Sequence, residues 1–128
     1  MLLFVDDEVA THKYITKIRG GIPVVAFSSA RDAISFLDEN ASELTCVISD
    51  FYMVGMSGLE LLTYCKTHYP HIYRILFTAM DIPDFEHALE DGTVQTLMAK
   101  PLDLAEFKRL VSDCVCQKQQ RRNLIASA

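Results

Sequence analysis

The sequence of 128 residues contains no apolar run that approaches the length needed to cross a bilayer. Its start, MLLFVDD, turns acidic after five apolar residues, so it lacks the basic n-region and long apolar core of a signal peptide. The formal charge of −5, from 12 basic and 17 acidic residues, argues against a nucleic-acid surface, which needs a basic stripe. These absences predict a cytoplasmic protein with no membrane segment and no direct nucleic-acid contact.

The spacing of the four cysteines excludes the usual metal-binding and redox motifs. None of the four cysteines forms a CxxC pair, and no histidine stands at zinc-ligand spacing from them. We expect Cys46 and Cys65 to be free thiols that fill space in the core. Cys114 and Cys116 differ by two positions on a predicted helix, so they face different directions and are not expected to act together.

The apolar residues predict a single α/β domain. Half of all residues are hydrophobic, which suffices for one core in a chain of this length. Short, continuous apolar runs are typical of strands that are buried on both faces of a parallel sheet. Five such strands alternate with five helical patterns, which predicts a doubly wound parallel sheet with right-handed crossovers. The expected strands are Leu2–Asp6, Ile22–Phe27, Thr45–Asp50, Tyr73–Thr78 and Val94–Ala99.

Boundary residues support these assignments. Pro23 predicts that the second strand lies at an edge of the sheet, because proline cannot donate to a ladder. Ser28 or Ser29 is suited to cap the second helix, and Asp103 the last one. The third helix is expected over Gly58–Tyr69 and a short fourth helix from about Pro83 to Asp91.

Polar residues that suit phosphoryl chemistry stand at the ends of four predicted strands. The first strand ends on Asp6 and Asp7, the third on Asp50, the fourth on Thr78, and the fifth is followed by Lys100. Because ligands of open parallel sheets bind at the carboxyl ends of the strands, these side chains are expected to share one rim. Clustered carboxylates favour a hard cation such as Mg²⁺ between them.

The remaining members of this set would complement a phosphoryl group. A hydroxyl and an ammonium, together with the metal, would neutralise the charge on its oxygens, and Asp50 would be the nucleophile that forms an aspartyl phosphate. Each residue alone has an ordinary explanation, such as a turn aspartate or a solvated surface lysine. The functional interpretation depends on their conjunction at four separate strand ends.

This pattern resembles the response-regulator receiver domain of two-component phosphorelay systems. The resemblance rests on the acidic pair in VDDE, the aspartate that opens DFYMVGMSG, the TA after the fourth strand and the KP after the fifth. It covers the chain from Leu2 to about Val115 and implies the flavodoxin-like strand order 2-1-3-4-5. It also implies a cis peptide bond between Lys100 and Pro101.

The resemblance implies a role for each matching residue. Asp50 would accept phosphate from a histidine kinase or a histidine phosphotransfer domain. Asp6, Asp7, Asp50 and the main-chain carbonyl of Tyr52 would hold Mg²⁺, with Asp6 acting largely through water. Thr78 and Lys100 would contact the phosphoryl oxygens. The chain would be a signalling receiver that catalyses its own phosphorylation and dephosphorylation, and not an enzyme in the usual sense.

Several positions depart from the family's pattern. Leu97 replaces the aromatic residue that usually precedes the lysine by three positions, and Val54 replaces a proline of the active loop. Gly55 adds backbone freedom to that loop. Tyr52 and Met80 occupy two variable positions beside the phosphoryl group. Because both are bulky, we expect them to hinder the hydrolytic water and to give a long-lived phosphoryl state.

The expected organisation is a receiver domain over residues 1–116 and a helical extension or linker over residues 117–128. An output domain could lie beyond the C-terminus, and the face of the fourth helix, fifth strand and fifth helix could form a homodimer. In the family, this face is the one that phosphorylation reshapes. Here it would carry Leu97, Phe107 and Cys114 nearby.

Three alternatives remain at this stage. A phosphohydrolase of the haloacid-dehalogenase type would need a general acid two residues after Asp50, where Tyr52 stands. A flavodoxin-like FMN binder would need a phosphate loop after the first strand, where the acidic run is electrostatically wrong. A degenerate receiver that acts only as a phosphorylation-independent interaction module is kept open by Leu97 and Val54.

Overall fold

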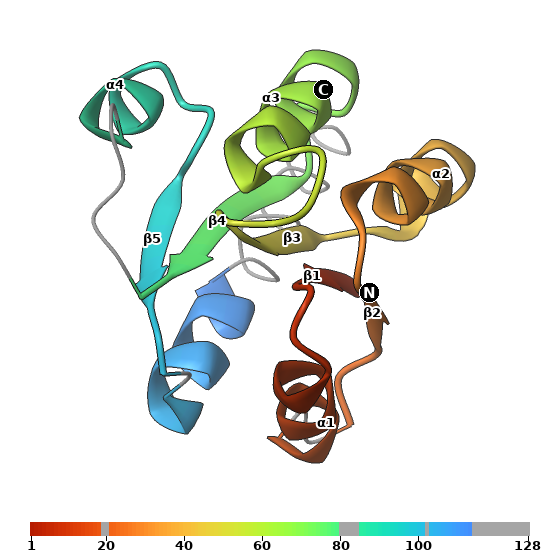
Figure 1. Ribbon diagram of the computed structural model, residues 1–128, viewed down its shortest axis with the longest axis vertical. Coiled ribbons are helices and arrows are strands. Elements are labelled where there is room, and N and C mark those ends of the chain that lie inside the picture. The colour runs from red at the N-terminus through yellow and green to blue at the C-terminus, as the bar shows by residue number, and fades with distance from the viewer. Residues whose placement is uncertain (19–20, 80–84, 102, 114–128) are drawn as a thin grey trace, which may run out of the picture.

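The computed structural model describes residues 1–18, 21–79, 85–101 and 103–113, and its centre is a five-stranded parallel sheet (Figure 1). The strand order is β2-β1-β3-β4-β5, which confirms the predicted fold. β2, which follows Pro23, is an edge strand, as the proline predicted. The strands are β1 (Leu2–Val5), β2 (Val24–Phe27), β3 (Cys46–Asp50), β4 (Tyr73–Thr78) and β5 (Thr96–Ala99).

Several strands are one or two residues shorter than the apolar runs that predicted them. β1 ends at Val5, one residue before Asp6, and β2 begins at Val24 instead of Ile22. The amide of Leu2 donates to the carbonyl of Pro23 at 2.9 Å, and the proline itself has no amide to continue the ladder. The apolar runs therefore located the strands, while backbone hydrogen bonding set their ends.

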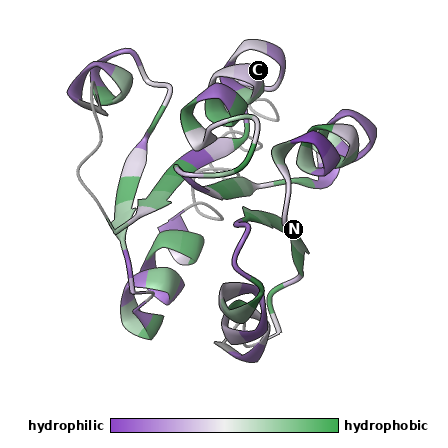
Figure 2. Cartoon of the chain, in the orientation of Figure 1, coloured by the Kyte–Doolittle hydropathy of each residue, from purple (hydrophilic) through white to green (hydrophobic). Residues whose placement is uncertain are grey.

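Helices cover both faces of the sheet. They are α1 (Val9–Ile18), α2 (Ala30–Asn40), α3 (Gly58–His68), α4 (Phe85–Glu90) and a last helix over residues 104–113, with a short 3-10 turn η1 (Ala41–Glu43) after α2. α1 and the last helix pack on one face, and α2, α3 and α4 on the other (Figure 1). Figure 2 shows apolar residues concentrated in the strands and polar residues on the outer sides of the helices.

Polar side chains cap three of these helices. Ser29 Oγ accepts from the amide of Asp32 at 3.1 Å, and an Asp103 carboxylate oxygen accepts from the amide of Glu106 at 3.0 Å, as predicted. Ser57 caps α3 by accepting from the amide of Glu60 at 3.2 Å. Each cap satisfies an amide of a first helical turn that has no partner within its own helix. All three caps lie at the carboxyl edge of the sheet, where the strand-end side chains gather.

The sheet separates two apolar clusters. Leu3, Val5, Val47 and Leu76 face α2 and α3 on one side, and Phe4, Ile48, Ile75 and Phe77 face α1 and the last helix on the other. Both Cys46 and Cys65 are buried in these clusters as free thiols, as predicted. Cys114 and Cys116 and the predicted extension over residues 117–128 lie outside the described residues. The predicted domain boundary at residue 116 lies there as well.

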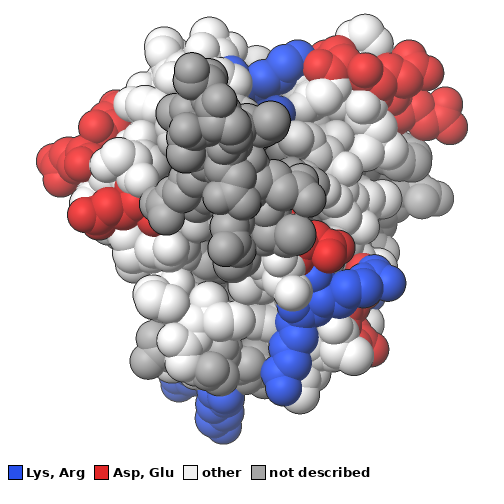
Figure 3. Space-filling view, turned by 180° about the vertical axis from the view of Figure 1, so that it is seen from behind, with Lys and Arg blue, Asp and Glu red and all other residues white. Residues whose placement is uncertain are grey.

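Surface charge differs between the two helical layers. α1 and the last helix expose Lys13, Lys17, Lys108 and Arg109 with one acid, Asp113, whereas α2, α3 and α4 expose Asp32, Asp38, Glu39, Glu60, Glu86 and Glu90 with one arginine, Arg31. Seen from behind, most visible basic atoms lie in the lower half of the molecule and most acidic atoms in the upper half (Figure 3). This separation gives the molecule a field that can orient a charged partner. Within the described residues, no helix is both apolar enough and long enough to traverse a bilayer.

Candidate functional site

The topology of the sheet brings Asp6 and Asp50 together. β1 and β3 are neighbouring parallel strands, and Val5 pairs with Ser49, so the residues that follow each of them emerge side by side. Asp50 is the last residue of β3 and is 6% exposed, while Asp6 is fully buried. Two carboxylates at adjacent strand ends need positive charge close by, because like charges repel and burial removes the water that would screen them.

Hydrogen bonds fix Asp6 from several sides. Its amide donates to the carbonyl of Phe27 at 3.1 Å, and its Oδ1 accepts from the amide of Glu8 at 2.9 Å. His12 Nε2 donates to its carbonyl oxygen. The other carboxylate oxygen, Oδ2, is buried and has no well-aligned hydrogen bond from any described residue. Among the described residues, this oxygen is instead contacted by the Lys100 ammonium, whose Nζ lies 3.1 Å away.

Lys100 supplies the positive charge of the site. Its Nζ lies 3.1 Å from Asp6 Oδ2 and 3.4 Å from Asp50 Oδ1, and its side chain is 17% exposed. The amide of Lys100 donates to the carbonyl of Thr78 at 3.1 Å, which ties the end of β5 to the end of β4. The Lys100–Pro101 peptide bond is cis, as the resemblance implied. One ammonium thus bridges two carboxylates from different strands.

The electrostatics of this group favour binding of a further cation. Burial raises the pKa of Asp50, the charge of Asp6 raises it further, and Lys100 opposes both effects. Burial lowers the pKa of Lys100, but its contacts with Asp6 and Asp50 outweigh this effect, so its pKa is raised overall. The ammonium is therefore held in its charged form, while the Asp50 carboxylate is still short of compensating charge.

Three carboxylates are positioned to share a metal ion. One oxygen each from Asp6, Asp7 and Asp50 can be chosen so that all lie within 4.8 Å of one another, with Asp7 exposed and the other two buried. Oxygen donors in this number suit a hard divalent cation that keeps several of its waters. Asp6 Oδ2 accepts no well-aligned hydrogen bond from the described residues and is paired only with the Lys100 ammonium, so it can also face a metal ion. The residues present are therefore compatible with Mg²⁺.

The other predicted site residues lie around this cluster. Thr78 is the last residue of β4 and is buried. Tyr52 lies two residues beyond Asp50, its side chain is 50% exposed, and its ring packs edge-on against Phe51 at 4.5 Å between centroids. Met80 lies outside the described residues. The described members of the predicted set therefore share one rim of the sheet.

Two residues near the site were missed by reasoning from the sequence. His12 on α1 donates to the Asp6 carbonyl, and the ring of Phe77 lies below Lys100, with Nζ 5.2 Å from its centroid. Phe77 directly precedes Thr78, so its place in the sequence already indicates that it lies near the site. His12 carries no comparable signal, because its contact depends on how α1 packs against the end of β1.

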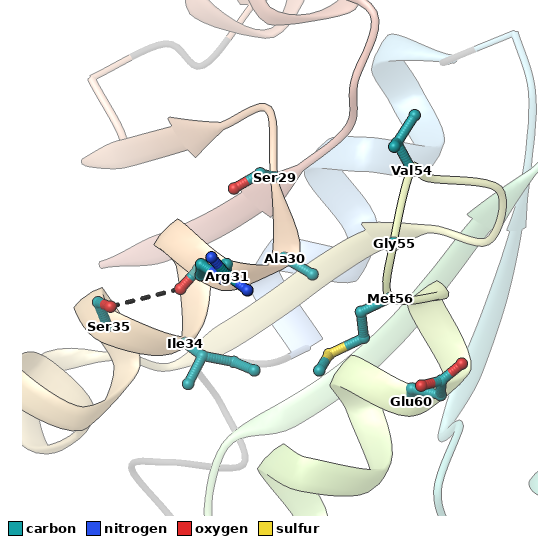
Figure 4. A pocket seen from close by; sticks show the side chains of 9 residues that line it. All are labelled: Ser29, Ala30, Arg31, Ile34, Ser35, Val54, Gly55, Met56 and Glu60. Carbon is teal, nitrogen blue, oxygen red and sulfur yellow. Dashed lines mark hydrogen bonds between the residues drawn. The ribbon is translucent and has the colours of Figure 1, made fainter.

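Two hollows flank the site. A cleft of about 710 Å³ is lined by Glu8, Ala10, Thr11, Tyr14, Phe77, Ala79, Lys100 and Pro101, and it opens onto the ammonium. A second cavity, of about 720 Å³, lies between α2 and the loop that follows β3, and Figure 4 shows Ile34 and Met56 on its walls. Neither Asp50 nor Lys100 lines this second cavity. The first cleft therefore gives access to Lys100.

The departures from the family's pattern are visible in the structure. Leu97 on β5 is 39% exposed, and Val54 is 90% exposed on the loop after β3. Gly55 has a φ of 87°, a left-handed conformation that glycine adopts at little cost. The carboxylates and the lysine are thus tightly packed, while the residues that replace conserved family features lie at the surface.

Comparison with known proteins identifies the family. The model of the response regulator receiver domain matches residues 2–112. The fold and the strand-end residues therefore define a receiver, and the chain belongs to the response regulator receiver domain family.

Curated relatives include full regulators from bacteria and plants. The chain is 35% identical to response regulator protein FleR of Pseudomonas aeruginosa over 114 residues, which cover 87% of the chain and 24% of FleR. It is 28% identical to two-component response regulator ARR5 of Arabidopsis thaliana, with 94% of the chain and 72% of ARR5 covered. The chain thus spans about a quarter of FleR and most of ARR5.

Solved structures show the same fold at lower identity. A response regulator receiver domain protein from Clostridium thermocellum matches with a TM-score of 0.82 and 22% identity, covering 93% of this chain and 96% of that one. Chemotaxis protein CheY4 of Vibrio cholerae matches with a TM-score of 0.78 and 17% identity, covering 88% and 96%. At these identities the likeness supports the fold alone.

Proposed function

We propose that the chain is a phosphorylatable switch of a two-component system, in which Asp50 accepts a phosphoryl group from a histidine kinase or a histidine phosphotransfer domain. The observation that carries this proposal is the Lys100 ammonium, which lies within 3.4 Å of both Asp6 and Asp50 at the rim of the sheet. A carboxylate oxygen of Asp50 attacks phosphorus, and the phosphorus–nitrogen bond to the donor imidazole breaks. The imidazole nitrogen keeps the bonding electrons and leaves the donor histidine unphosphorylated.

Asp6, Asp7, Asp50 and the main-chain carbonyl of Tyr52 are the groups that we expect to hold Mg²⁺. When bound, the ion supplies positive charge to the phosphoryl oxygens. The protein contributes by fixing the carboxylates in position before the ion binds. Asp6 is fixed through its amide, its carbonyl and Oδ1, so that Oδ2 faces the shared space.

Lys100 and Thr78 would act on the phosphoryl group itself. The ammonium already stands 3.4 Å from Asp50 Oδ1, so it would pair with a phosphoryl oxygen on Asp50 after small movement. Thr78 ends the neighbouring strand and would donate its hydroxyl to another phosphoryl oxygen. These contacts stabilise charge that grows as the group is transferred, which is how phosphoryl transfer is usually accelerated.

Incubation of the protein with Mg²⁺ and acetyl phosphate, followed by intact mass measurement, tests the proposal. We expect one added phosphoryl group, which disappears when Mg²⁺ is removed. Asp50→Ala should abolish it, whereas Asp32→Ala, which removes an exposed carboxylate on α2, should not. A modification that survives Asp50→Ala would contradict the assignment.

The second candidate function is a receiver that binds partners without being phosphorylated. The surface exposure of Leu97 and Val54 favours it, because these positions depart from the residues that usually transmit the phosphorylation signal. Beryllofluoride separates the two candidates. If backbone amide signals of β5 and the last helix do not shift when the Asp50 site is filled, the interaction-module function is the better one.

The haloacid-dehalogenase alternative receives no support from the site. Tyr52, whose side chain is half exposed, stands where that class needs a carboxylic general acid. We expect no turnover of a generic aryl phosphate under conditions that phosphorylate Asp50.

An output surface is proposed on α4, β5 and the last helix. This face exposes Leu89, Leu97 and Leu104, each 38–40% accessible. Phe107, which we had expected near this surface, is fully buried against the sheet because it points inward with Leu110 and Val111. Light scattering with and without beryllofluoride would test whether this face forms a homodimer.

A further inference from the structure

A buried aromatic ring lies directly beneath the ammonium of the site. We propose that Phe77 is a positioning residue for Lys100, and that its ring holds the ammonium against Asp6 and Asp50 through a cation–π interaction. The consequence for phosphoryl transfer rests on the proposed function, whereas the contact itself does not.

The distances fit this interaction. Lys100 Nζ lies 5.2 Å from the centroid of the Phe77 ring, and attraction between an ammonium and an aromatic face extends to about 6 Å. On its other side, Nζ meets the two carboxylates at 3.1 and 3.4 Å. Both residues also line the cleft that opens onto the site. The ring thus faces the ammonium where water would otherwise hydrate it, and an aliphatic side chain there would offer no attraction.

Strand register explains why the ring lies there. Phe77 pairs with Asp50 on one neighbouring strand and with Met98 on the other. Side chains of paired residues in a parallel sheet lie on the same face, and Lys100 follows Met98 by two positions, so all of them face α1 and the last helix. Phe77 is 1% exposed, so its ring has no room to turn away.

Phe77 is packed against a second ring, which in turn contacts a third. The Phe4 ring packs against it at 6.0 Å between centroids, and His12 meets Phe4 edge-on at 6.1 Å. His12 also donates to the carbonyl of Asp6. An aromatic row of Phe77, Phe4 and His12 therefore connects the ring that contacts Lys100 with the histidine that donates to Asp6. The row therefore holds the Lys100 ammonium and the Asp6 carboxylate in fixed positions relative to each other.

This arrangement matters when the charges around Lys100 change. As Asp50 gains a phosphoryl group, the ammonium must exchange a carboxylate partner for a phosphoryl oxygen. The Phe77 ring is neutral and does not take part in this exchange, so its attraction for the ammonium is unchanged throughout. It should keep Lys100 pointing at the reacting group.

Fluorinated phenylalanines of increasing fluorine content, incorporated at position 77, test the inference. Fluorine withdraws electron density from the ring face with little change in size, so the cation–π attraction weakens in steps while packing is retained. We expect the motion of the Lys100 Cε–Nζ group, measured by ¹³C relaxation without metal or phosphate, to increase in the same steps. The rate constant for phosphorylation by acetyl phosphate should fall by about three- to tenfold across the series.

The same substitutions at Phe4 provide the matched control. Phe4 is equally buried and belongs to the same aromatic row, but it lies one ring further from the ammonium. Fluorination there should leave the motion of Lys100 unchanged. Lys100 motion that shows no graded response at position 77, or an equal response at position 4, would overturn the inference. If the parent protein is not phosphorylated at all, the proposed function fails, while the relaxation measurement still decides the role of Phe77.

Discussion

Gly58 lies so close to the end of β3 that a β-carbon at this position would meet the main-chain oxygen of Asp50 at 2.0 Å. The amide of Gly58 also donates to the carbonyl of Phe51 at 2.9 Å, so the start of α3 is pressed against the backbone that presents Asp50. A side chain at this position would have to push the helix away from Asp50.

We therefore expect Gly58→Ala to lower the free energy of unfolding by about 2–4 kcal/mol and to slow phosphorylation of Asp50. Urea denaturation and the acetyl phosphate assay measure the two effects. Gly55→Ala is the control, because a β-carbon there meets nothing within 4 Å and suffers only from the φ of 87°. Gly55→Ala should lower the free energy of unfolding by about 1 kcal/mol. Equal losses in the two variants would show that close packing against Asp50 is unimportant.

Asp50 itself is expected to lower stability. Burial and the neighbouring Asp6 raise its pKa, so the ionised carboxylate is less favourable in the folded protein than in the unfolded chain. For an acid with a raised pKa, stability is lost as pH rises through the unfolded and then the folded pKa, and the loss is complete above the folded pKa.

Asp50→Asn should consequently raise the melting temperature by about 2–5 °C at pH 7 without metal. This gain should vanish in acid, below the ordinary pKa of an aspartate, where the parent carboxyl is neutral. Saturating Mg²⁺ should stabilise the parent and narrow the difference. Thermal unfolding followed by circular dichroism provides the measurement, and a variant less stable than its parent at pH 7 would contradict this account.

Arg74 secures the amino end of the sheet, opposite the site. Its side chain is almost fully buried, and its guanidinium donates to the carbonyls of Pro70, Ile72, Gly92 and Thr93 at 2.9–3.2 Å. These carbonyls belong to the loops before β4 and β5.

Replacement of Arg74 by methionine keeps much of the side-chain volume and removes all four hydrogen bonds. We expect the free energy of unfolding to fall by about 3 kcal/mol, because buried carbonyls lose their donors. Arg31→Met, on the exposed side of α2, should change it by less than about 0.5 kcal/mol. Similar urea midpoints for the two variants would show that the four hydrogen bonds of Arg74 contribute little to stability.

Asp38 links α2 to α3 through two tyrosines. Its Oδ1 accepts from the hydroxyls of Tyr64 at 2.7 Å and Tyr69 at 2.6 Å. The hydrogen bonds from Tyr69 and Tyr64 lower the pKa of Asp38, and the same bond raises the pKa of Tyr69 to about 12. Because the folded pKa of Asp38 is lowered, its contribution to stability is present above the ordinary aspartate pKa and is lost as pH falls through the folded value.

Tyrosine absorbance during alkaline titration tests this link. In Asp38→Ala, ionisation of Tyr64 and Tyr69 should move down toward the ordinary tyrosine pKa. Glu39→Ala removes the neighbouring exposed carboxylate and should leave the titration unchanged. If both variants titrate like the parent, the hydrogen bonds to Asp38 do not persist in solution.

Much of the fold and of the site followed from the sequence. Continuous apolar runs located all five strands, the alternation of strands with helices predicted a parallel sheet, and the family resemblance implied the strand order that the structure has. Once the topology is known, the chemistry follows, because the residues after β1, β3 and β5 must meet at one edge. For this reason Asp6, Asp50 and Lys100 could be grouped correctly without any structure.

Other features depend on contacts that no local pattern encodes. Arg74 stands in the predicted strand Tyr73–Thr78, and its four carbonyl partners come from two separate loops. The contacts of His12 and Phe77 depend on rotamers and on register across the sheet. Phe107 is expected near the output face from the sequence, and the orientation of the last helix buries it instead.

Tyr52 should govern how long the phosphoryl group persists. Its half-exposed ring stands on the loop directly after Asp50, where it can restrict the approach of a hydrolytic water. We expect Tyr52→Asn to shorten the phosphoryl lifetime by about tenfold, since a factor of ten requires only ~1.4 kcal/mol of barrier. Tyr52→Phe, which keeps the ring and loses only the hydroxyl, should retain the parent lifetime. Decay of the phosphorylated mass after removal of acetyl phosphate gives the rate.

Met80→Ala tests the second bulky position independently. If neither Tyr52→Asn nor Met80→Ala hydrolyses the phosphoryl group faster than the parent, bulk at these positions does not protect it.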